Sequence, residues 1–357
     1  MKTVAINGKF LGAPLNGVHR TAALYTEAMI AHRTTDLNVD IIAPRNLSQD
    51  STFSTLEPIV LRSPLGMGQA WEMISLPLAT RKHLLLNFCN LAPAIHPNFV
   101  VMIHDAQTYL YPEDYSGRQA VAYRALLPLI ARRARKVLTV SEFARDSLAR
   151  HRVAPLDKIS VVHNGTDHLL RVRPDNAVLD RHRLRPKEYA LAIGSAKSYK
   201  NIARLFDAFA HRDLADFPLV IAGGPPPDRY KNLASPPPAN IRFLGPVSDP
   251  ELRALYSHAA MFLFPSRTEG FGLPPLEAMN LGCAVIAADA GAMPEICAEG
   301  ALLIDPEDTV AWRNAVIAFR DPARRQARSA AAEARARFFS WERAGARLWE
   351  VVEDLVL

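Results

Sequence analysis

The chain contains little cysteine and no long hydrophobic run. Only three cysteines occur in 357 residues, and they are widely spaced and show no metal-ligand pattern. No segment approaches the roughly 18 consecutive apolar residues of a membrane span. The N-terminal MKTVAING passes directly into a strand-like segment and lacks the apolar core of a signal peptide. These absences favour a protein of the reducing cytoplasm.

Several motifs of common enzyme classes are missing as well. A dinucleotide-binding fold opens with G-x-G-x-x-G after its first strand, whereas GKFLGAPLNG follows the first strand here. The P-loop, G-x-S-x-G and H-E-x-x-H patterns do not occur. The chain also has no D-x-D pair, which would hold a divalent ion beneath a diphosphate. We therefore expect no metal and no separate cofactor, so Lys, Arg and amide dipoles must neutralise any bound diphosphate.

The charge balance is basic, with a formal net charge of +6 and a pI near 9.3. Such a balance suits an anionic ligand, a nucleic acid or an anionic membrane surface. Much of the excess lies in 124–136 and 323–337, where it is typical of solvated helix surfaces. No zinc-finger, RNP-like or helix-turn-helix signature supports nucleic acid, so we expect none. Peripheral contact of 124–136 with an anionic membrane is left open as the alternative.

Short β-rich runs alternate with longer segments of helical period along the whole chain. This alternation predicts parallel, doubly wound sheets, and the length suits two domains. We predict an α/β fold with Rossmann-like domains at 1–170 and 171–339 and a final helix at 340–357. The predicted strands are 2–7, 37–43, 83–88, 99–104, 136–141, 158–163, 189–195, 217–224, 240–245, 260–265, 283–289 and 301–305. The predicted helices before the last are 18–32, 68–81, 117–135, 142–151, 200–211, 249–259, 275–281, 308–320 and 324–338.

The segment PSRTEGFGLPPLEAMNLG (265–282) places two carboxylates around a glycine-rich turn. A strand is predicted before the turn, and after it a helix that begins with prolines and stops at Gly282. The amides that can face a phosphate at this helix start belong to Gly270, Phe271, Gly272 and Leu273. Glu269 and Glu277 would repel phosphate but accept hydrogen bonds from hydroxyls. A nucleotide sugar has both a phosphate and hydroxyls; a structural turn with capping acids is the alternative.

Further candidates lie at the ends of other predicted strands. Lys200 begins the predicted helix KNIARLFDAF, at the carboxyl edge where open α/β sheets bind ligands. Lys197 and Arg267 lie near the same edge. In the first half, VMIHDAQTYLYP places His104 and Asp105 at a strand end, where such a pair can bind a sugar hydroxyl or move a proton. The alternatives are solvated cations and a polar strand end closed by local hydrogen bonds.

Together these features resemble the GT-B-fold retaining glycosyltransferases, specifically glycosyltransferase family 4. The resemblance spans essentially the whole chain. Its most specific part is the pair of glutamates separated by seven residues in EGFGLPPLE (269–277). The other matching segments are NGVHR (16–20), IHD (103–105), LTVSEFARDSL (138–148), ISVVHNGTD (159–167), KN (200–201) and IRFLGPVSDPEL (241–252).

The resemblance implies a role for each matching residue in the second half. Glu269 would bind hydroxyls of the transferred sugar, and Glu277 the ribose of the nucleotide. Lys200 would contact the diphosphate, and Val247 would lie near the base. The amides of Phe271, Gly272 and Leu273 would face the sugar and the diphosphate. Many relatives carry a second basic residue early in the loop before the lysine, where this chain has Gly194-Ser195-Ala196; Lys197 or Arg267 would then compensate.

In the first half, the resemblance implies that Gly17 closes on the diphosphate and that His104 lies by the transferred sugar, with Asp105 beside it. The predicted protein is thus a metal-independent retaining hexosyltransferase with a cleft between its domains. Its second domain would bind a nucleotide diphosphate sugar and its first a glycan or lipid-linked glycan acceptor. The last helix would return to pack on the first domain.

The mechanism implied is front-face attack by the acceptor hydroxyl with strong stabilisation of the leaving group, because no carboxylate obviously serves as a nucleophile. The IHD segment and the acidic loop resemble those of mannosyltransferases of surface-polysaccharide assembly, so GDP-mannose is the first donor to test. Two other classes stay open. One is a catalytically inactive nucleotide-sugar-binding or regulatory protein of the same fold, and the other is a two-domain dehydrogenase, which the missing dinucleotide fingerprint opposes.

Overall fold

The computed structural model describes residues 2–13, 16–32, 37–48, 54–66, 68–230 and 237–356. The chain forms two compact units, one of Met1–Gly165 with Trp341–Leu357 and one of Thr166–Ser340. The predicted boundary between residues 170 and 171 falls within a short 3₁₀ turn, Asp167–Arg171, of the second unit. Within the described residues, no helix is both long and apolar enough to cross a membrane.

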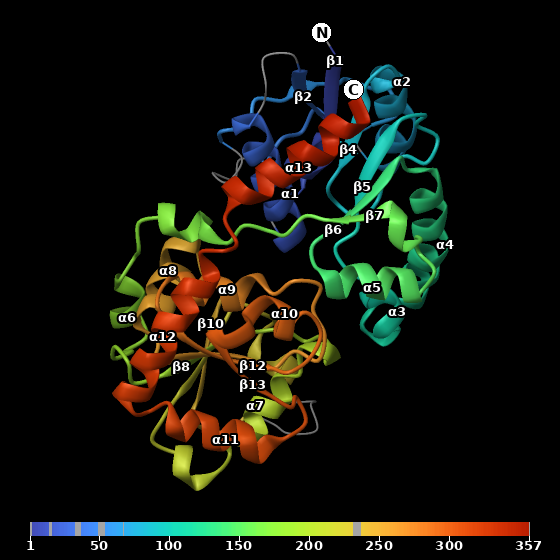
Figure 1. Cartoon of the computed structure of the whole chain (residues 1–357). Coiled ribbons are helices and arrows are strands. Elements are labelled where there is room, and N and C mark those ends of the chain that lie inside the picture. The colour runs from blue at the N-terminus through green and yellow to red at the C-terminus, as the bar shows by residue number, and fades with distance from the viewer. Residues whose placement is uncertain are drawn as a thin grey trace. The chain divides into compact units, whose positions relative to one another are not determined.

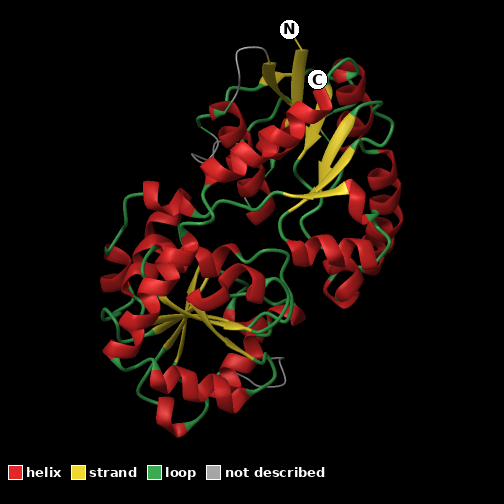
Figure 2. Cartoon of the chain, in the orientation of Figure 1, coloured by secondary structure: helices red, strands yellow, loops and turns green. Residues whose placement is uncertain are grey.

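The first unit is built on a seven-stranded parallel sheet in the order β3-β2-β1-β4-β5-β6-β7 (Figure 1). Helices lie on both sides of the strands (Figure 2). The strands are β1 (Lys2–Asn7), β2 (Leu37–Ala43), β3 (Ile59–Val60), β4 (Leu84–Asn87), β5 (Phe99–Met102), β6 (Lys136–Thr139) and β7 (Ile159–Val161). The helices are α1 (Gly17–Ala31), α2 (Leu76–Thr80), α3 (Gln107–Leu110), α4 (Gly117–Arg133), α5 (Glu142–Arg150) and α13 (Trp341–Val356).

The final helix, α13, returns to this first unit and packs on α1, as predicted (Figure 1). Gly345 permits the close approach, because a Cβ there would lie 2.7 Å from the Ala28 carbonyl oxygen. Trp341, at the start of α13, meets the ring of Tyr25 edge-on at 5.1 Å between centroids. The apolar face of α13 is therefore buried within the first unit although it follows the second unit in sequence.

The second unit has a six-stranded parallel sheet in the order β10-β9-β8-β11-β12-β13. Its strands are β8 (Ala190–Ile193), β9 (Leu219–Ala222), β10 (Ile241–Gly245), β11 (Met261–Phe264), β12 (Ala284–Ala288) and β13 (Ala301–Ile304). Its helices are α6 (Ala177–Arg181), α7 (Ile202–Phe209), α8 (Asp249–His258), α9 (Leu273–Asn280), α10 (Met293–Cys297), α11 (Thr309–Ala318) and α12 (Pro322–Ala336).

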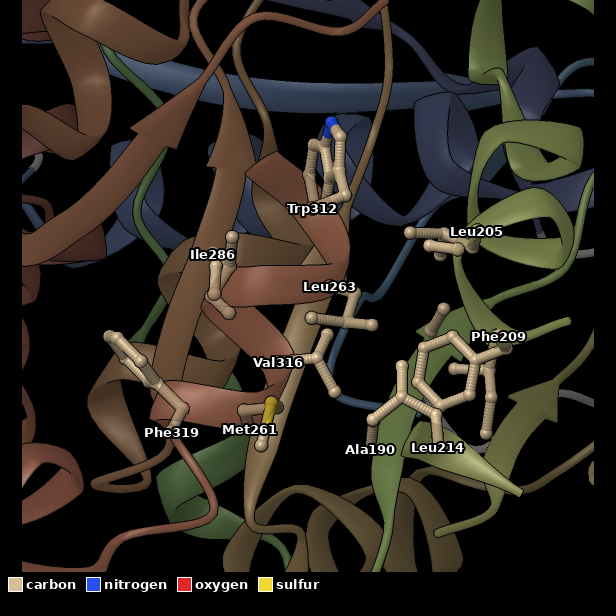
Figure 3. Close-up of a cluster of buried hydrophobic side chains, with 14 of the residues drawn as sticks. Ala190, Leu205, Phe209, Leu214, Met261, Leu263, Ile286, Trp312, Val316 and Phe319 are labelled. Atoms are coloured by element: carbon tan, nitrogen blue, oxygen red, sulfur yellow. The ribbon is translucent and has the colours of Figure 1, made fainter. Parts of the chain in front are cut away.

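The core of the second unit explains why the sequences of these strands are continuous apolar runs. Both faces of a parallel sheet are covered, so the strand residues pack against helices on each side. Figure 3 shows Trp312 of α11 and Leu205 of α7 on the same side of the sheet as Leu263 of β11. These three side chains are fully buried, and burial of each contributes about 1.5–3 kcal/mol. The indole N–H of Trp312 donates to the Asp305 carbonyl at 3.1 Å.

The predicted fold class, two Rossmann-like parallel-sheet domains, is confirmed, with local corrections. The helix expected to begin at Lys200 begins at Ile202, because Asn201 adopts a left-handed conformation (φ 53°) after a 3₁₀ turn at Ser198–Lys200. The helix expected over 68–81 contains a π-helical turn at Trp71–Ser75 before α2. The sequence patterns also missed the short elements β3, α3, α6 and α10.

Candidate active site

The strand order of the second sheet identifies the edge at which open α/β sheets typically hold a ligand. The chain runs outward from β8 to β9 and β10 and then crosses to β11 on the other side of β8. The crevice between β8 and β11 is therefore the topological switch point, where open α/β sheets hold ligands beyond the carboxyl ends of their strands. The loops that leave these two strands, residues 194–200 and 265–272, contain Lys200 and Glu269.

The acidic loop is held in a conformation that requires glycine at two positions. Gly272 precedes α9 with φ 100°, and a Cβ there would lie 2.3 Å from Met293 Cε. Gly291 has φ 61°, and a Cβ there would lie 2.7 Å from the Glu269 nitrogen. The Ala292 amide also donates to the Glu269 carbonyl at 3.2 Å. The backbone on both sides of Glu269 is thus fastened to the turn that precedes α10, which fixes where its carboxylate points.

Lys200 and Glu269 are brought into direct contact. The Lys200 Nζ donates to Glu269 Oε1 at 2.6 Å, and both side chains are largely buried, with 28% and 12% of their surfaces exposed. The Lys200 ammonium also lies 5.6 Å from the centroid of the Phe264 ring. An ammonium has three protons, so one can hold the carboxylate while the others bind an anion. This part of the site can therefore hold hydroxyls and a phosphate side by side.

Asn201 supports this arrangement in a way that the sequence did not reveal. Its side-chain amide donates to the carbonyls of Pro265 and Pro306, at 3.2 and 2.8 Å. These bonds stabilise the left-handed backbone at Asn201 and join the turn that carries Lys200 to the loop that carries Glu269. Asparagine tolerates this conformation better than most residues. The adjacent residues Lys200 and Asn201 thus combine a cation with the side chain that holds the Ser198–Lys200 turn in place.

Glu277 lies in the second turn of α9 and is 7% exposed. Its Oε2 accepts a hydrogen bond from the Tyr256 hydroxyl at 3.3 Å, and its Oε1 lies 3.3 Å from Nε2 of His168. His168 is itself 8% exposed. Sequence reasoning missed both partners. His168 directly follows the matching segment ISVVHNGTD, but only the fold places it against a carboxylate 109 positions later in the chain.

The candidates for a compensating second cation differ in their surroundings. Arg267 forms an ion pair with Glu307, with 3.1 Å between Nη2 and Oε2, and donates to the Ser198 carbonyl at 3.1 Å. It therefore braces the Lys200 turn. Lys197 lies with its ammonium 5.5 Å from the centroid of the Tyr199 ring.

Val247, the residue predicted to lie near the base, is half-buried in the loop between β10 and α8.

The remaining predicted residues lie in the first unit. His104 is 8% exposed, and its Nε2 is 2.7 Å from the Phe88 carbonyl. Burial lowers the pKa of His104, so the ring is neutral near pH 7, with its proton on Nε2 and Nδ1 available as an acceptor. Asp105 Oδ1 accepts from the Gln107 amide at 3.0 Å at the start of α3. Gly17 is the first residue of α1, which Asn16 caps through the His19 amide.

The structure thus brings Lys200 and Glu269 together and places Glu277 on the helix that follows the same loop. His104, Asp105 and Gly17 belong to the other unit. Among the described residues, no three His, Cys, Asp or Glu side chains are grouped as metal ligands would be.

Comparisons with known proteins match both units. Residues 180–335 match the family model of glycosyl transferases group 1, and residues 78–168 match that of glycosyltransferase family 4. The O-antigen chain mannosyltransferase RfbU of Salmonella typhimurium is 30% identical over 292 residues, which cover 77% of this chain and 75% of the relative. The D-inositol 3-phosphate glycosyltransferase of Corynebacterium glutamicum is 30% identical over 285 residues, covering 72% and 67%.

Among solved structures, Anabaena HepE in complex with UDP-glucose matches with a TM-score of 0.75 and 20% identity. The match covers 99% of this chain and 100% of that one. At this level of identity, the likeness concerns the fold.

Proposed function

Because this chain belongs to glycosyltransferase family 4 and has the GT-B fold, we propose that it is a retaining hexosyltransferase that uses a nucleotide diphosphate sugar. The acceptor is a hydroxyl of a glycan or lipid-linked glycan in surface-polysaccharide synthesis. The observation that carries the proposal is the contact between Lys200 and Glu269 at the switch point of the second sheet. Lys200 offers a cation for the diphosphate, and Glu269 offers a carboxylate for the sugar hydroxyls. The two groups are hydrogen-bonded to each other.

In this proposal, each part of the acidic loop meets a different part of the donor. The amides of Gly270, Phe271, Gly272 and Leu273 face the sugar and diphosphate, where the N-terminus of α9 adds a favourable dipole. Glu269 accepts hydrogen bonds from the transferred sugar. Glu277, deeper in α9, accepts hydrogen bonds from the ribose, with Tyr256 and His168 behind it. Val247 lies near the base.

The reaction proposed is front-face transfer with retention of configuration. As the glycosidic bond breaks, negative charge grows on the diphosphate, and Lys200 stabilises that charge most strongly in the transition state. His104 is neutral and offers Nδ1 to a hydroxyl of the transferred sugar, with Asp105 fixing the adjacent turn. Gly17 lets the start of α1 approach the diphosphate closely.

GDP-mannose is the first donor to test, because the relative in Salmonella is named a mannosyltransferase. HepE was solved with UDP-glucose, which makes UDP-glucose the matched competitor. Thermal shift with each nucleotide diphosphate and turnover with each sugar separate the two. A ligand at 100 times its Kd raises the free energy of unfolding by about 2.7 kcal/mol.

The two glutamates provide the test of the proposed roles. Glu269→Ala should abolish transfer, because Glu269 contacts the sugar, while nucleotide diphosphate binding survives through Lys200, which no longer has its carboxylate partner. Glu277→Ala should weaken binding of the free nucleotide itself by about 1.5–3 kcal/mol, the contribution of a charged hydrogen-bond partner. Calorimetry with the free nucleotide measures both. Equal losses of nucleotide affinity would refute the assignment.

We also propose that no metal or other cofactor is needed, since Lys200 and the N-terminus of α9 supply the positive charge. Activity should then persist in excess EDTA. If EDTA inactivates the protein, and added magnesium or manganese restores the activity, this electrostatic account is wrong.

A peripheral membrane contact is proposed for the exposed face of α4. Val121, Leu126 and Leu129 expose 68%, 42% and 49% of their surfaces along this helix. Arg118, Arg132 and Arg133 are exposed on the same helix. Apolar side chains flanked by arginines suit insertion at an anionic lipid surface. Binding to vesicles with phosphatidylglycerol, absent with phosphatidylcholine alone and lost in Val121→Glu/Leu129→Glu, would support the contact.

The second candidate function is a nucleotide-sugar-binding protein that lacks catalysis. It shares the contact between Lys200 and Glu269, so binding experiments do not separate the two candidates. Turnover does: nucleotide affinity without release of nucleotide diphosphate, across a panel of donors and acceptors, would favour the inactive protein.

A further inference from the structure

A cavity of about 670 Å³ lies at the amino-terminal edge of the sheet in the second unit. Its lining includes Tyr189 and Pro218, which directly precede β8 and β9, and Arg242, the second residue of β10. These three strands are neighbours in the sheet. Lys200 follows the other end of β8, and a strand rises ~3.3 Å per residue, so the four residues of β8 separate the two edges by roughly 13 Å. The cavity is therefore distinct from the candidate active site.

Cationic side chains are the main feature of the lining. Five of them border the cavity: Arg183, Arg185, Lys187, Arg242 and Arg320. Two of the five have acidic partners, Asp216 for Arg320 at 2.7 Å and Glu188 for Arg185 at 3.8 Å. Within the part of the chain that the structure describes, no carboxylate pairs with the other three. Like charges gathered in one place repel one another and destabilise the folded state, so a bound anion would be stabilising there.

The contacts that these three cations make with the protein leave donors for a ligand. Lys187 Nζ donates to the carbonyls of Ser257 and Ala259, each at 2.9 Å, at the carboxyl end of α8. One of the three ammonium protons therefore remains. Arg242 Nη1 donates to the Arg183 carbonyl at 3.2 Å, which uses one of the five N–H groups of the guanidinium. This bond also holds Arg242 beside the segment that carries Arg183.

Arg183 and Lys187 occupy backbone positions that glycine adopts more readily. Their φ angles are 50° and 62°, both in the left-handed region. Arg183 lies just past the end of α6, where glycine is the usual residue. The turn from Arg185 to Glu188 is closed by a hydrogen bond of 3.1 Å between the Glu188 amide and the Arg185 carbonyl. Because Pro186 precedes it, Lys187 holds the glycine-favouring position of a type II turn. Such backbone cost is typical of functional sites.

The lining also indicates which kind of anion fits. Guanidinium groups match the geometry of phosphate oxygens and bind them through two parallel hydrogen bonds. The two aromatic rings of the lining are not open to stacking, since Tyr189 and Phe217 are 1% and 5% exposed. The Arg320 guanidinium also lies 5.2 Å from the centroid of the Phe217 ring. A nucleobase thus finds no ring to stack on, whereas a group of phosphate oxygens can reach several cations.

We propose that this cavity is a second anion site, separate from the glycosyl-transfer site, and that it binds a compact phosphate-bearing group of two or more negative charges. Arg183, Lys187 and Arg242 hold the phosphate oxygens, and Arg320, braced by Asp216, closes one wall. The site goes beyond the proposed function, because no donor or acceptor contact is assigned to this edge of the sheet. A free oligophosphate and the phosphate headgroup of a lipid share this chemistry, so the test includes both.

The first arm of the test is calorimetry with inorganic tripolyphosphate and the full chain. Arg183→Gln/Arg242→Gln should weaken binding by about tenfold or more, the effect of losing a charged hydrogen bond. The matched control is Arg173→Gln/Arg337→Gln, which removes the same charge from exposed arginines of the same unit that do not line the cavity; it should bind as wild type does. The loss should be equal in a Lys200→Met background, because the two sites are far enough apart for their effects to add.

The second arm is sedimentation with vesicles of phosphatidylcholine and phosphatidic acid. If vesicle binding is lost only in Arg183→Gln/Arg242→Gln, and tripolyphosphate does not bind, the ligand is a lipid headgroup. Melting temperatures identify variants that fail to fold, and Arg183→Gln alone, at an exposed side chain, replaces a double variant that does. The proposal is overturned if wild type binds neither probe, if the folded cavity variant binds as wild type does, or if the control variant loses as much affinity. Nucleotide diphosphate binding should be unchanged in the cavity variant, so failure of the proposed function leaves this result unaffected.

Discussion

Lys200 and Glu269, 69 positions apart in the chain, form an ion pair with 2.6 Å between Nζ and Oε1. The pair joins the turn after β8 to the loop after β11, the two neighbouring strands at the switch point of the sheet. Each residue restrains the other: the lysine neutralises a carboxylate that would otherwise repel phosphate, and the carboxylate holds the ammonium at the sheet edge. The two proposed donor contacts are therefore interdependent.

This interdependence gives the first prediction. Lys200→Met should lower kcat by ~10²–10³, the usual cost of losing one transition-state donor. It should also lower the free energy of unfolding by about 1–3 kcal/mol, because the largely buried Glu269 loses its partner. Adding Glu269→Gln should restore the melting temperature and leave activity low. A near-normal kcat of Lys200→Met would contradict the account. So would a double variant whose melting temperature is as low as that of Lys200→Met.

The second prediction concerns His168, which we interpret as a positioning residue for Glu277. His168→Ala should weaken nucleotide diphosphate binding roughly tenfold, since Glu277 loses the side chain 3.3 Å from Oε1. Transfer at saturating donor should change little, so the effect appears in KM and not in kcat. His168→Gln, which keeps a polar group near the carboxylate, should recover part of the affinity. A fall in kcat with no change in KM would show that His168 acts elsewhere.

The third prediction uses two matched glycines. Gly17 and Gly117 are each the first residue of a helix, α1 and α4, and at both positions an added Cβ has no neighbouring atom within 4 Å. Alanine at either position should therefore leave the melting temperature unchanged or slightly higher. Only Gly17→Ala should raise KM for the donor, because Gly17 is expected to contact the diphosphate. Equal donor KM in both variants would remove Gly17 from the site.

The fourth prediction is that the native protein has no reactive thiol. Burial raises the pKa of Cys283 and Cys297 to about 12. Cys89 is half-buried, and desolvation together with the nearby Glu72 carboxylate raises the pKa of its thiol to about 12. Because the thiolate is the reactive form, each should react with iodoacetamide at pH 8 far more slowly than an exposed cysteine does. In guanidinium chloride all three should react quickly. Rapid labelling of Cys89 in the native state would contradict the raised pKa of its thiol.

Much of the fold was predictable because parallel strands buried on both faces leave a clear signal. Runs such as LVIA (Leu219–Ala222) are apolar at every position, and turns with glycine or proline separate them from helical segments. The start of α7 was not predictable, since Asn201 adopts its left-handed conformation with the help of carbonyls from Pro265 and Pro306. Those partners lie far along the chain, and a local pattern contains no information about them.

The sequence by itself determined the chemical types of the candidate site. The spacing of Glu269 and Glu277 around a glycine turn, and a lysine after a strand, already indicated a ligand with hydroxyls and phosphate. Only the tertiary structure decided which groups meet: Lys200 with Glu269, and His168 with Glu277. The physical reason is that each pair is made by tertiary packing. Hydrogen bonding between β8 and β11 brings together the loops that carry Lys200 and Glu269, and packing of the 3₁₀ turn Asp167–Arg171 against α9 brings His168 to Glu277. Contacts of this kind depend on which elements pack together and not on any local period of residues.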